Sequence, residues 1–175
     1  IQEDDAIVIG PGMTRSDETK TIVNALAGKF SDKKWVVDGG ALQEVDVQVI
    51  PGTAILTPHR GEFERLFGEA RIEAMAKKYK CTILLKGVED TVCNEYKCVK
   101  IKGGNEGMTK GGTGDVLAGL VGALYCKNDA FLAAATGSYI NKKAGDNLYK
   151  RVGPFFNASD LVAEIPRVMK EELGY

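Results

Sequence analysis

Short apolar runs alternate with amphipathic segments along the first half of the chain. Apolar runs of this length, ended by Gly, Pro or charged residues, are typical of buried β-strands. The segments between them place apolar residues three and four positions apart, which predicts helices. The expected strands are residues 6–10, 34–40, 53–58 and 81–87, and the expected helices are 16–30, capped by Ser16 or Asp17, and 61–80.

The second half of the chain predicts a hairpin followed by helices. Residues 91–101 fit two strands that turn at Asn94 and Glu95, and helices are expected over 115–126, 130–149 and 158–173. Strands that alternate with helices imply a largely parallel sheet with helices on both faces. The chain has 175 residues, so we expect a single α/β domain over 1–175.

Glycine-rich polar turns follow the four predicted strands. They read "GPG" from Gly10, "DGG" from Asp38, "TPHRGE" from Thr57 and "KGVED" from Lys86. Ligands of parallel α/β sheets bind at the carboxyl ends of the strands. The sequence therefore predicts one ligand cleft lined by these turns.

Composition and charge exclude several classes of function. The net charge of −1 favours neither nucleic acid nor an anionic membrane, and no run of about 18 apolar residues occurs. The four cysteines form no CxxC pair and His59 is the only histidine, which argues against a zinc site. We interpret Cys81, Cys93 and Cys98 as small buried hydrophobic residues of a protein in a reducing compartment, the cytoplasm.

The segment "GGTGD", residues 111–115, precedes an apolar helical face. Free amides at a helix N-terminus bind anions, and glycines leave room for a phosphate group. The loop is not a Walker A motif, because no GK[ST] follows its glycines. Asp115 has two interpretations: a general base that takes a proton from a hydroxyl attacking the phosphate, or a helix cap assisted by Thr113.

Four motifs in this order resemble the ADP/ATP-dependent NAD(P)H-hydrate dehydratases of the ribokinase-like superfamily. They are "GPGM" at 10–13, "LTPHRGEF" at 56–63, "LLKG" at 84–87 and "GNEGMTKGGTGDVLAG" at 104–119. The resemblance implies a three-layer sandwich with a mostly parallel sheet. It also implies a repair reaction, in which a nucleotide phosphorylates the ring hydroxyl of hydrated NADH or NADPH and phosphate then leaves.

The resemblance also implies roles for individual residues. Asp115 is the expected catalytic base, and Asn105 and Glu106 are candidates for organising Mg²⁺ or phosphate. The expected anion hole is Gly112, Thr113 and Gly114; the expected nucleotide contacts are Lys86, Gly87, Val88, Glu89, Asp90 and Gly114; the expected substrate contacts are Gly10, Gly12, His59 and Asp115.

Position alone leaves simpler interpretations open for several of these residues. His59 follows a proline at a strand end and fits a turn, Lys86 fits a solvated strand-end charge, and the Gly10–Gly12 stretch fits an ordinary turn. Asp38 fits either a helix cap or a residue lining the cleft.

The resemblance implies ATP or ADP with Mg²⁺, hydrated NADH or NADPH as the substrate, and a homo-oligomer such as a tetramer. The net charge and the apolar runs predict no nucleic acid or membrane partner. The sequence departs from the family pattern in several places, of which two concern the expected substrate side. A longer N-terminal segment usually precedes the GPG element, so the domain is expected to lack its N-terminal part. "DGGAL" also stands where the family has DADAL, so Gly40 replaces an aspartate.

Two other functions fit the same residues less well. A ribokinase-like kinase acting on a vitamin-precursor alcohol explains GGTGD equally well but explains TPHRGEF and NEGM less well. A non-catalytic nucleotide-binding module would gain nothing from a carboxylate at position 115 beside a phosphate.

Overall fold

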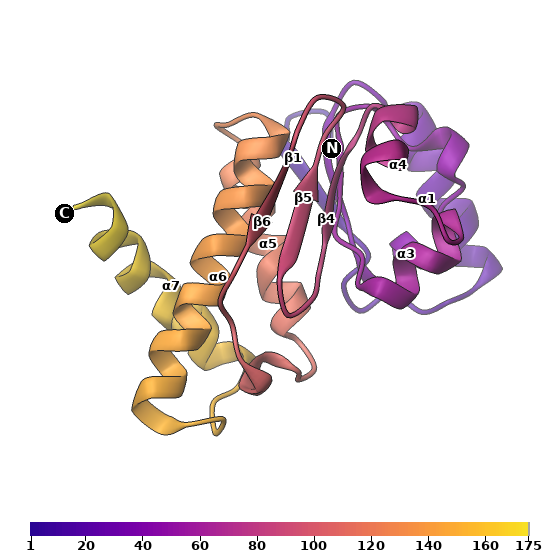
Figure 1. Ribbon diagram of the computed structural model, residues 1–175. Helices are drawn as coiled ribbons and strands as arrows, with labels where there is room; N and C mark the ends of the chain where they lie inside the picture. Colours follow the sequence, from indigo (N-terminus) through magenta and orange to yellow (C-terminus); the bar gives the residue numbers. More distant parts are fainter. Residues whose placement is uncertain (175) are drawn as a thin grey trace.

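The computed structural model describes residues 1–174, which form one six-stranded sheet between two groups of helices. The strands follow the chain in spatial order (Figure 1). Their bounds are β1 (Ala6–Ile9), β2 (Lys34–Val37), β3 (Ala54–Leu56), β4 (Thr82–Leu85), β5 (Asp90–Cys93) and β6 (Cys98–Ile101). Strands β1 to β4 are parallel, whereas β5 and β6 pair antiparallel. The mostly parallel sheet of the sequence prediction is confirmed.

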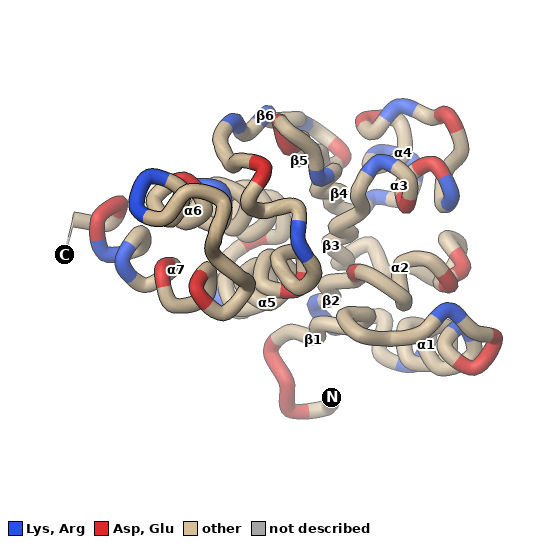
Figure 2. Tube along the Cα trace, turned by 90° about the horizontal axis from the view of Figure 1, so that it is seen from below, with Lys and Arg blue, Asp and Glu red and all other residues tan. Residues whose placement is uncertain are grey.

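Helices cover both faces of the sheet, as Figure 2 shows with the sheet seen from one end. Four helices that connect the parallel strands lie together on one side: α1 (Asp17–Lys29), α2 (Gly39–Glu44), α3 (Arg60–Phe67) and α4 (Ile72–Tyr79). The other side carries α5 (Thr113–Tyr125) and α6 (Ala130–Val152), and α7 (Ala158–Leu173) packs mainly against α6. Two short 3₁₀ helices, η1 (Val47–Val49) and η2 (Glu106–Met108), complete the fold.

Side-chain alternation along the strands builds two cores. On β2, Trp35 and Val37 pack in the core under α1 to α4, whereas Val36 packs in the core under α5 and α6. Successive strand residues point to opposite faces, so strands buried on both sides must be continuously apolar. This requirement explains why the apolar runs of the sequence predict the sheet.

Several element bounds differ from the sequence predictions. The strand expected over residues 34–40 ends at Val37, because Gly39 has a φ of +50° and begins α2. The helix expected over 61–80 is divided into α3 and α4, because Gly68 has a φ of +69° and ends α3. The prediction of Ser16 as the cap of α1 is confirmed, since its side chain accepts a hydrogen bond from the Thr19 amide.

The interpretation of two cysteines needs correction, although Cys93 is buried as predicted. Cys93 and Cys98 face each other across the β5–β6 pair and form a disulfide. Cys98 lies on the exposed part of β6, so it is not the buried hydrophobic residue that its apolar neighbours predict. Cys81 does match the prediction: burial raises the pKa of its thiol to about 12. The disulfide removes the argument from cysteines for a reducing compartment.

Among the described residues, no helix combines the length and apolar character that crossing a bilayer requires.

Candidate functional site

The turns after β1 and β2 are locked together by close backbone contact. The Gly10 carbonyl accepts hydrogen bonds from the amides of Met13 and Gly40. A Cβ atom at Gly10 would lie 1.7 Å from the Asp38 carbonyl oxygen, and Gly10 has a φ of +114°. Only glycine fits such an approach. The packing of these two turns therefore fixes where the Asp38 side chain begins.

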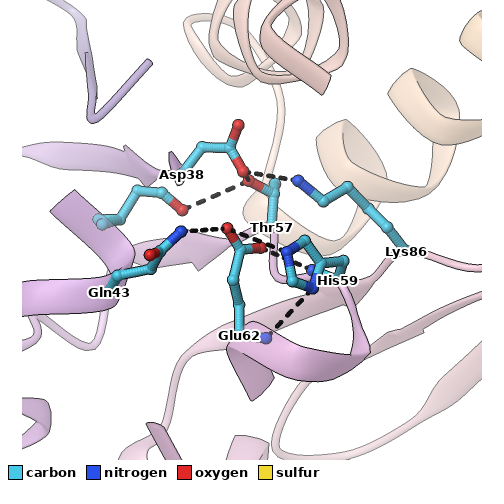
Figure 3. A network of polar contacts seen from close by, with 7 residues as sticks. Asp38, Gln43, Thr57, His59, Glu62 and Lys86 are labelled. Carbon is cyan, nitrogen blue, oxygen red and sulfur yellow. Dashed lines mark hydrogen bonds and ion pairs between the residues drawn. The ribbon is translucent and has the colours of Figure 1, made fainter. Parts of the chain in front are cut away.

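Asp38 joins the carboxyl ends of three neighbouring parallel strands. Its carboxylate oxygen Oδ1 accepts hydrogen bonds from the Thr57 hydroxyl and the Lys86 ammonium, each at 2.8 Å (Figure 3). Asp38 and Thr57 are buried, and the Lys86 side chain is 20% exposed. Asp38 makes no side-chain cap on α2, so its carboxylate serves the Lys86 ammonium instead of the helix end.

His59 begins α3 and makes a reciprocal cap with Glu62. Its Nδ1 accepts a hydrogen bond from the Glu62 amide, while the Glu62 carboxylate accepts one from the His59 amide (Figure 3). Gln43 donates to the same carboxylate. The His59 side chain is 59% exposed. It therefore has a structural role as a cap and also faces the cleft.

The predicted anion loop opens α5. Gly112 is the N-cap residue with a φ of +89°, and Thr113 donates its hydroxyl proton to the carbonyl oxygens of Met108 and Lys110. A Cβ atom at Gly114 would lie 3.6 Å from the Lys86 Nζ. The ammonium and the start of α5 thus form one positive region, which we call the anion end of the cleft: Lys86, Gly112 and Gly114.

Within this loop the amide of Thr113 is less free than the sequence suggests. It lies 3.4 Å from the Lys110 carbonyl oxygen, to which it donates a long hydrogen bond. The Thr113 side chain is buried, and its hydroxyl donates to the backbone of the loop instead of to a ligand.

Asp115 lies in the first turn of α5, is exposed, and does not cap the helix. The N-cap position belongs to Gly112, and no side-chain cap forms there. The capping interpretation of Asp115 is therefore wrong, and its carboxylate is available to another group.

A cleft of about 900 Å³ extends from the anion end across the loop after β4. Its walls include nine of the predicted residues: His59, Lys86, Gly87, Val88, Asp90, Asn105, Glu106, Thr113 and Gly114. The predicted residues outside its lining are Gly10, Gly12, Glu89, Gly112 and Asp115. Glu89 pairs instead with Lys100 on β6, and this hydrogen bond lowers the pKa of Glu89.

Comparison with known proteins identifies the family. A family model described as NAD(P)H-hydrate dehydratase matches residues 2–167. The chain belongs to this family. The bifunctional NAD(P)H-hydrate repair enzyme Nnr of Archaeoglobus fulgidus is 40% identical over 171 residues, which are 97% of this chain and 36% of that protein. The ADP-dependent (S)-NAD(P)H-hydrate dehydratase of Cenarchaeum symbiosum is 34% identical over 95% of this chain and 62% of its own length.

The chain spans between about one third and two thirds of the length of these relatives. A solved structure of the same family agrees with the fold. The ADP/ATP-dependent NAD(P)H-hydrate dehydratase of Bacillus subtilis, co-crystallised with ATP and Mg²⁺, has a TM-score of 0.81 at 26% identity over 97% of this chain and 67% of its own. Ribokinase of Thermotoga maritima, at 15% identity and a TM-score of 0.55 over 94% of this chain and 57% of its own, shares the fold alone.

Asn105 and Glu106, the family-based candidates for Mg²⁺ or phosphate, are engaged elsewhere. The Asn105 carboxamide donates to Asp146 and accepts from the Gly107 amide. Glu106 accepts a hydrogen bond from the Tyr149 hydroxyl, which lowers the pKa of Glu106 and raises that of Tyr149. No cluster of three or more metal-ligating side chains occurs among residues 1–174. This pair does not form a ready metal site.

Sequence reasoning missed Lys142, a buried cation of α6. Its ammonium lies 3.0 Å from the Gly87 carbonyl oxygen, 3.1 Å from those of Val88 and Gly103, and 3.2 Å from the Asp90 carboxylate. Asp90 also accepts hydrogen bonds from the Gly87 amide and the Ser138 hydroxyl. Lys142 therefore ties the loop after β4 to the loop after β6. The segment "INKKAGDN" gives no sign that its first lysine is buried.

Proposed function

We propose that this chain catalyses the nucleotide-dependent dehydration of hydrated NADH or NADPH. The observation that carries the proposal is the anion end, where the Lys86 ammonium adjoins the first turn of α5 in a cleft large enough for a nucleotide. Helix N-termini and ammonium groups together bind phosphate. Family membership and the names of the relatives supply the substrate class.

The transferred phosphoryl group is proposed to rest on the anion end. The amides of Gly112 and Gly114 and the Lys86 ammonium stabilise the charge on its oxygens. Asp115 lies in the same helical turn and takes the proton of the substrate's ring hydroxyl as that oxygen attacks the phosphorus. A phosphate ester forms on the ring, and the nucleotide leaves one phosphate shorter.

The second half of the reaction is an elimination. The ester phosphate leaves with the electrons of its carbon–oxygen bond, and the ring loses a proton from the neighbouring carbon. A ring double bond is restored. The anion end favours this step as well, because it stabilises the departing phosphate.

The nucleotide is ATP or ADP, with its phosphates at the anion end and the remainder along the loop Gly87 to Asp90. Mg²⁺ is proposed to enter with the nucleotide, since Mg²⁺ is commonly held by substrate phosphates and water. Asn105 and Glu106 do not fit as its direct ligands in their present hydrogen bonds. The chemistry assigned to this chain's residues does not depend on them.

The substrate is proposed to lie beside His59, Gly10 and Gly12, on the side of the anion end that faces the turn after β1. A homo-oligomer such as a tetramer is also proposed, on family resemblance alone. A cytoplasmic location is proposed as in the sequence prediction, although the disulfide removes the cysteine argument for it. In the cytoplasm the Cys93–Cys98 pair would be kept largely reduced.

The deciding experiment is an assay of NADH formation from hydrated NADH, followed by its absorbance, with ATP and with ADP. Nucleotide-dependent recovery of NADH, with one phosphate released per NADH formed, supports the proposal. Hydroxyethylthiazole serves as the competing acceptor. Phosphorylation of the thiazole without turnover of hydrated NADH would replace the proposal by the kinase alternative.

A further inference from the structure

The anion end accounts for only part of the cleft, and the wall formed by α6 has a different character. Asn141 and Lys142 line this wall, which we call the α6 wall. The Lys142 ammonium is surrounded by three carbonyl oxygens and the Asp90 carboxylate. An ammonium has three protons, so Lys142 has none to spare for a phosphate. The α6 wall therefore suits a neutral part of a ligand.

Asn141 is the residue of this wall whose hydrogen bonding is incomplete, and its side chain is almost entirely buried. The residue is 5% exposed, and its carboxamide oxygen has no hydrogen-bond partner among the described residues. A Cβ atom at Gly137, one turn earlier on α6, would meet Val121, and one at Gly145, one turn later, would meet Met108. Asn141 thus lies on the face of α6 that packs toward α5 and η2.

An unpartnered carboxamide in such a place lowers the stability of the fold. Burying a polar group without a hydrogen bond costs free energy that an apolar side chain of the same shape would not. A half-turn about the last side-chain bond exchanges the oxygen and nitrogen, so either can face the cleft. A buried polar group that is unsatisfied in the protein and lines a ligand cleft has the properties of a ligand contact.

The surroundings indicate which part of a nucleotide this contact would meet. Met108 and Leu117 line the cleft with Asn141 and offer apolar surface for a flat ring. A carboxamide presents one donor and one acceptor side by side. This pair matches one edge of adenine, where the 6-amino group donates and the ring nitrogen N7 accepts.

We propose that Asn141 recognises the adenine base of the nucleotide and sets the preference for adenine over other purines. The inference rests on the proposed function, because it requires that a nucleotide occupies the cleft. At the same edge, hypoxanthine carries a carbonyl oxygen beside N7. It would therefore face the carboxamide with two acceptors and lose one hydrogen bond.

The test compares Asn141→Leu with the unsubstituted chain in the binding of ADP, inosine diphosphate and inorganic pyrophosphate by calorimetry. We expect ADP to bind about 5- to 150-fold more weakly, as for the loss of a bidentate contact to adenine. Pyrophosphate affinity should stay unchanged, and the preference for ADP over inosine diphosphate should disappear. The melting temperature should hold or rise, because an unpartnered buried amide is removed.

Asn128→Leu is the matched control, since the Asn128 amide caps the far end of α5 by donating to the Leu124 carbonyl. It should lower the melting temperature and leave ADP affinity unchanged. Unaltered ADP affinity and base preference in Asn141→Leu would overturn the inference, as would an equal loss of pyrophosphate binding. In either case turnover of hydrated NADH by the unsubstituted chain would leave the proposed function standing. Failure of that chain to bind ADP would overturn both.

Discussion

Lys86 and Lys142 both line the cleft and both pair with a buried aspartate, yet their surroundings differ. The Lys86 side chain is 20% exposed and its one hydrogen-bond partner among the described residues is Asp38. The Lys142 side chain is 8% exposed and lies among three carbonyl oxygens besides Asp90. The Lys86 ammonium has protons left to donate to a ligand, whereas the Lys142 ammonium donates all of its protons to protein groups. A lysine in a cleft wall is thus a candidate phosphate ligand only when its own protein contacts leave it free.

On the proposed function the chemistry takes place beside the anion end, and Asp115→Asn tests this most strongly. Asn keeps the shape of the side chain but cannot take a proton, so turnover of hydrated NADH should fall about 10²- to 10⁴-fold. Stability should hardly change, because Asp115 does not cap α5. Steady-state kinetics and thermal melts check both expectations. Turnover within a few-fold of the unsubstituted chain would remove Asp115 from the mechanism.

The structural role of Lys142 predicts a large loss of stability. Lys142→Met leaves the Asp90 carboxylate buried without its cation, which should lower the free energy of unfolding by about 3–5 kcal/mol. Urea denaturation measures this loss. The double variant with Asp90→Asn should recover part of it, because no buried charge remains. A single variant as stable as the original chain would mean that Lys142 does not hold the two loops together.

For Lys86 we expect that a double variant will separate the effect on ADP binding from the effect on stability. Lys86→Met should weaken ADP binding about 10- to 150-fold, the size of a lost charge-assisted hydrogen bond of about 1.5–3 kcal/mol. It should also destabilise the fold, because Asp38 is buried. Adding Asp38→Asn should restore stability but not ADP affinity. If the double variant bound ADP normally, the ammonium would not belong to the anion end.

The smallest expected effect concerns the disulfide between β5 and β6, which involves neither Lys86 nor Lys142. Reducing the Cys93–Cys98 disulfide opens a loop with a sequence separation of 5, which should cost about 2 kcal/mol on the chain-entropy model. Cys93 lies at the end of β5 opposite to Asp90, so ADP affinity should not change. Calorimetry with and without dithiothreitol checks this. A loss of ADP binding on reduction would show that the hairpin controls the loop after β4.

The sheet and the glycine loop before α5 could be predicted because their signals are local. Buried parallel strands require continuous apolar runs, and a phosphate loop requires glycines before a helix. The roles of Asp38 and Lys142 could not be predicted, because each depends on partners far along the chain: Asp38 and Lys86 are 48 residues apart, and Lys142 and Gly87 are 55 apart. The disulfide could not be predicted either, because it depends on the register of β5 with β6.

The strand order of the sheet has a consequence for how the chain folds. Each strand pairs with the strand that precedes it in the sequence, so the sheet can grow one strand at a time as the chain emerges. A nascent chain that ends at Ile101 contains all six strands and the four helices on one face. The opposite face, with Val36, Ile55 and Leu84, stays uncovered until α5 and α6 are made. The helices that complete the cleft therefore also end the period in which this apolar face is open to aggregation.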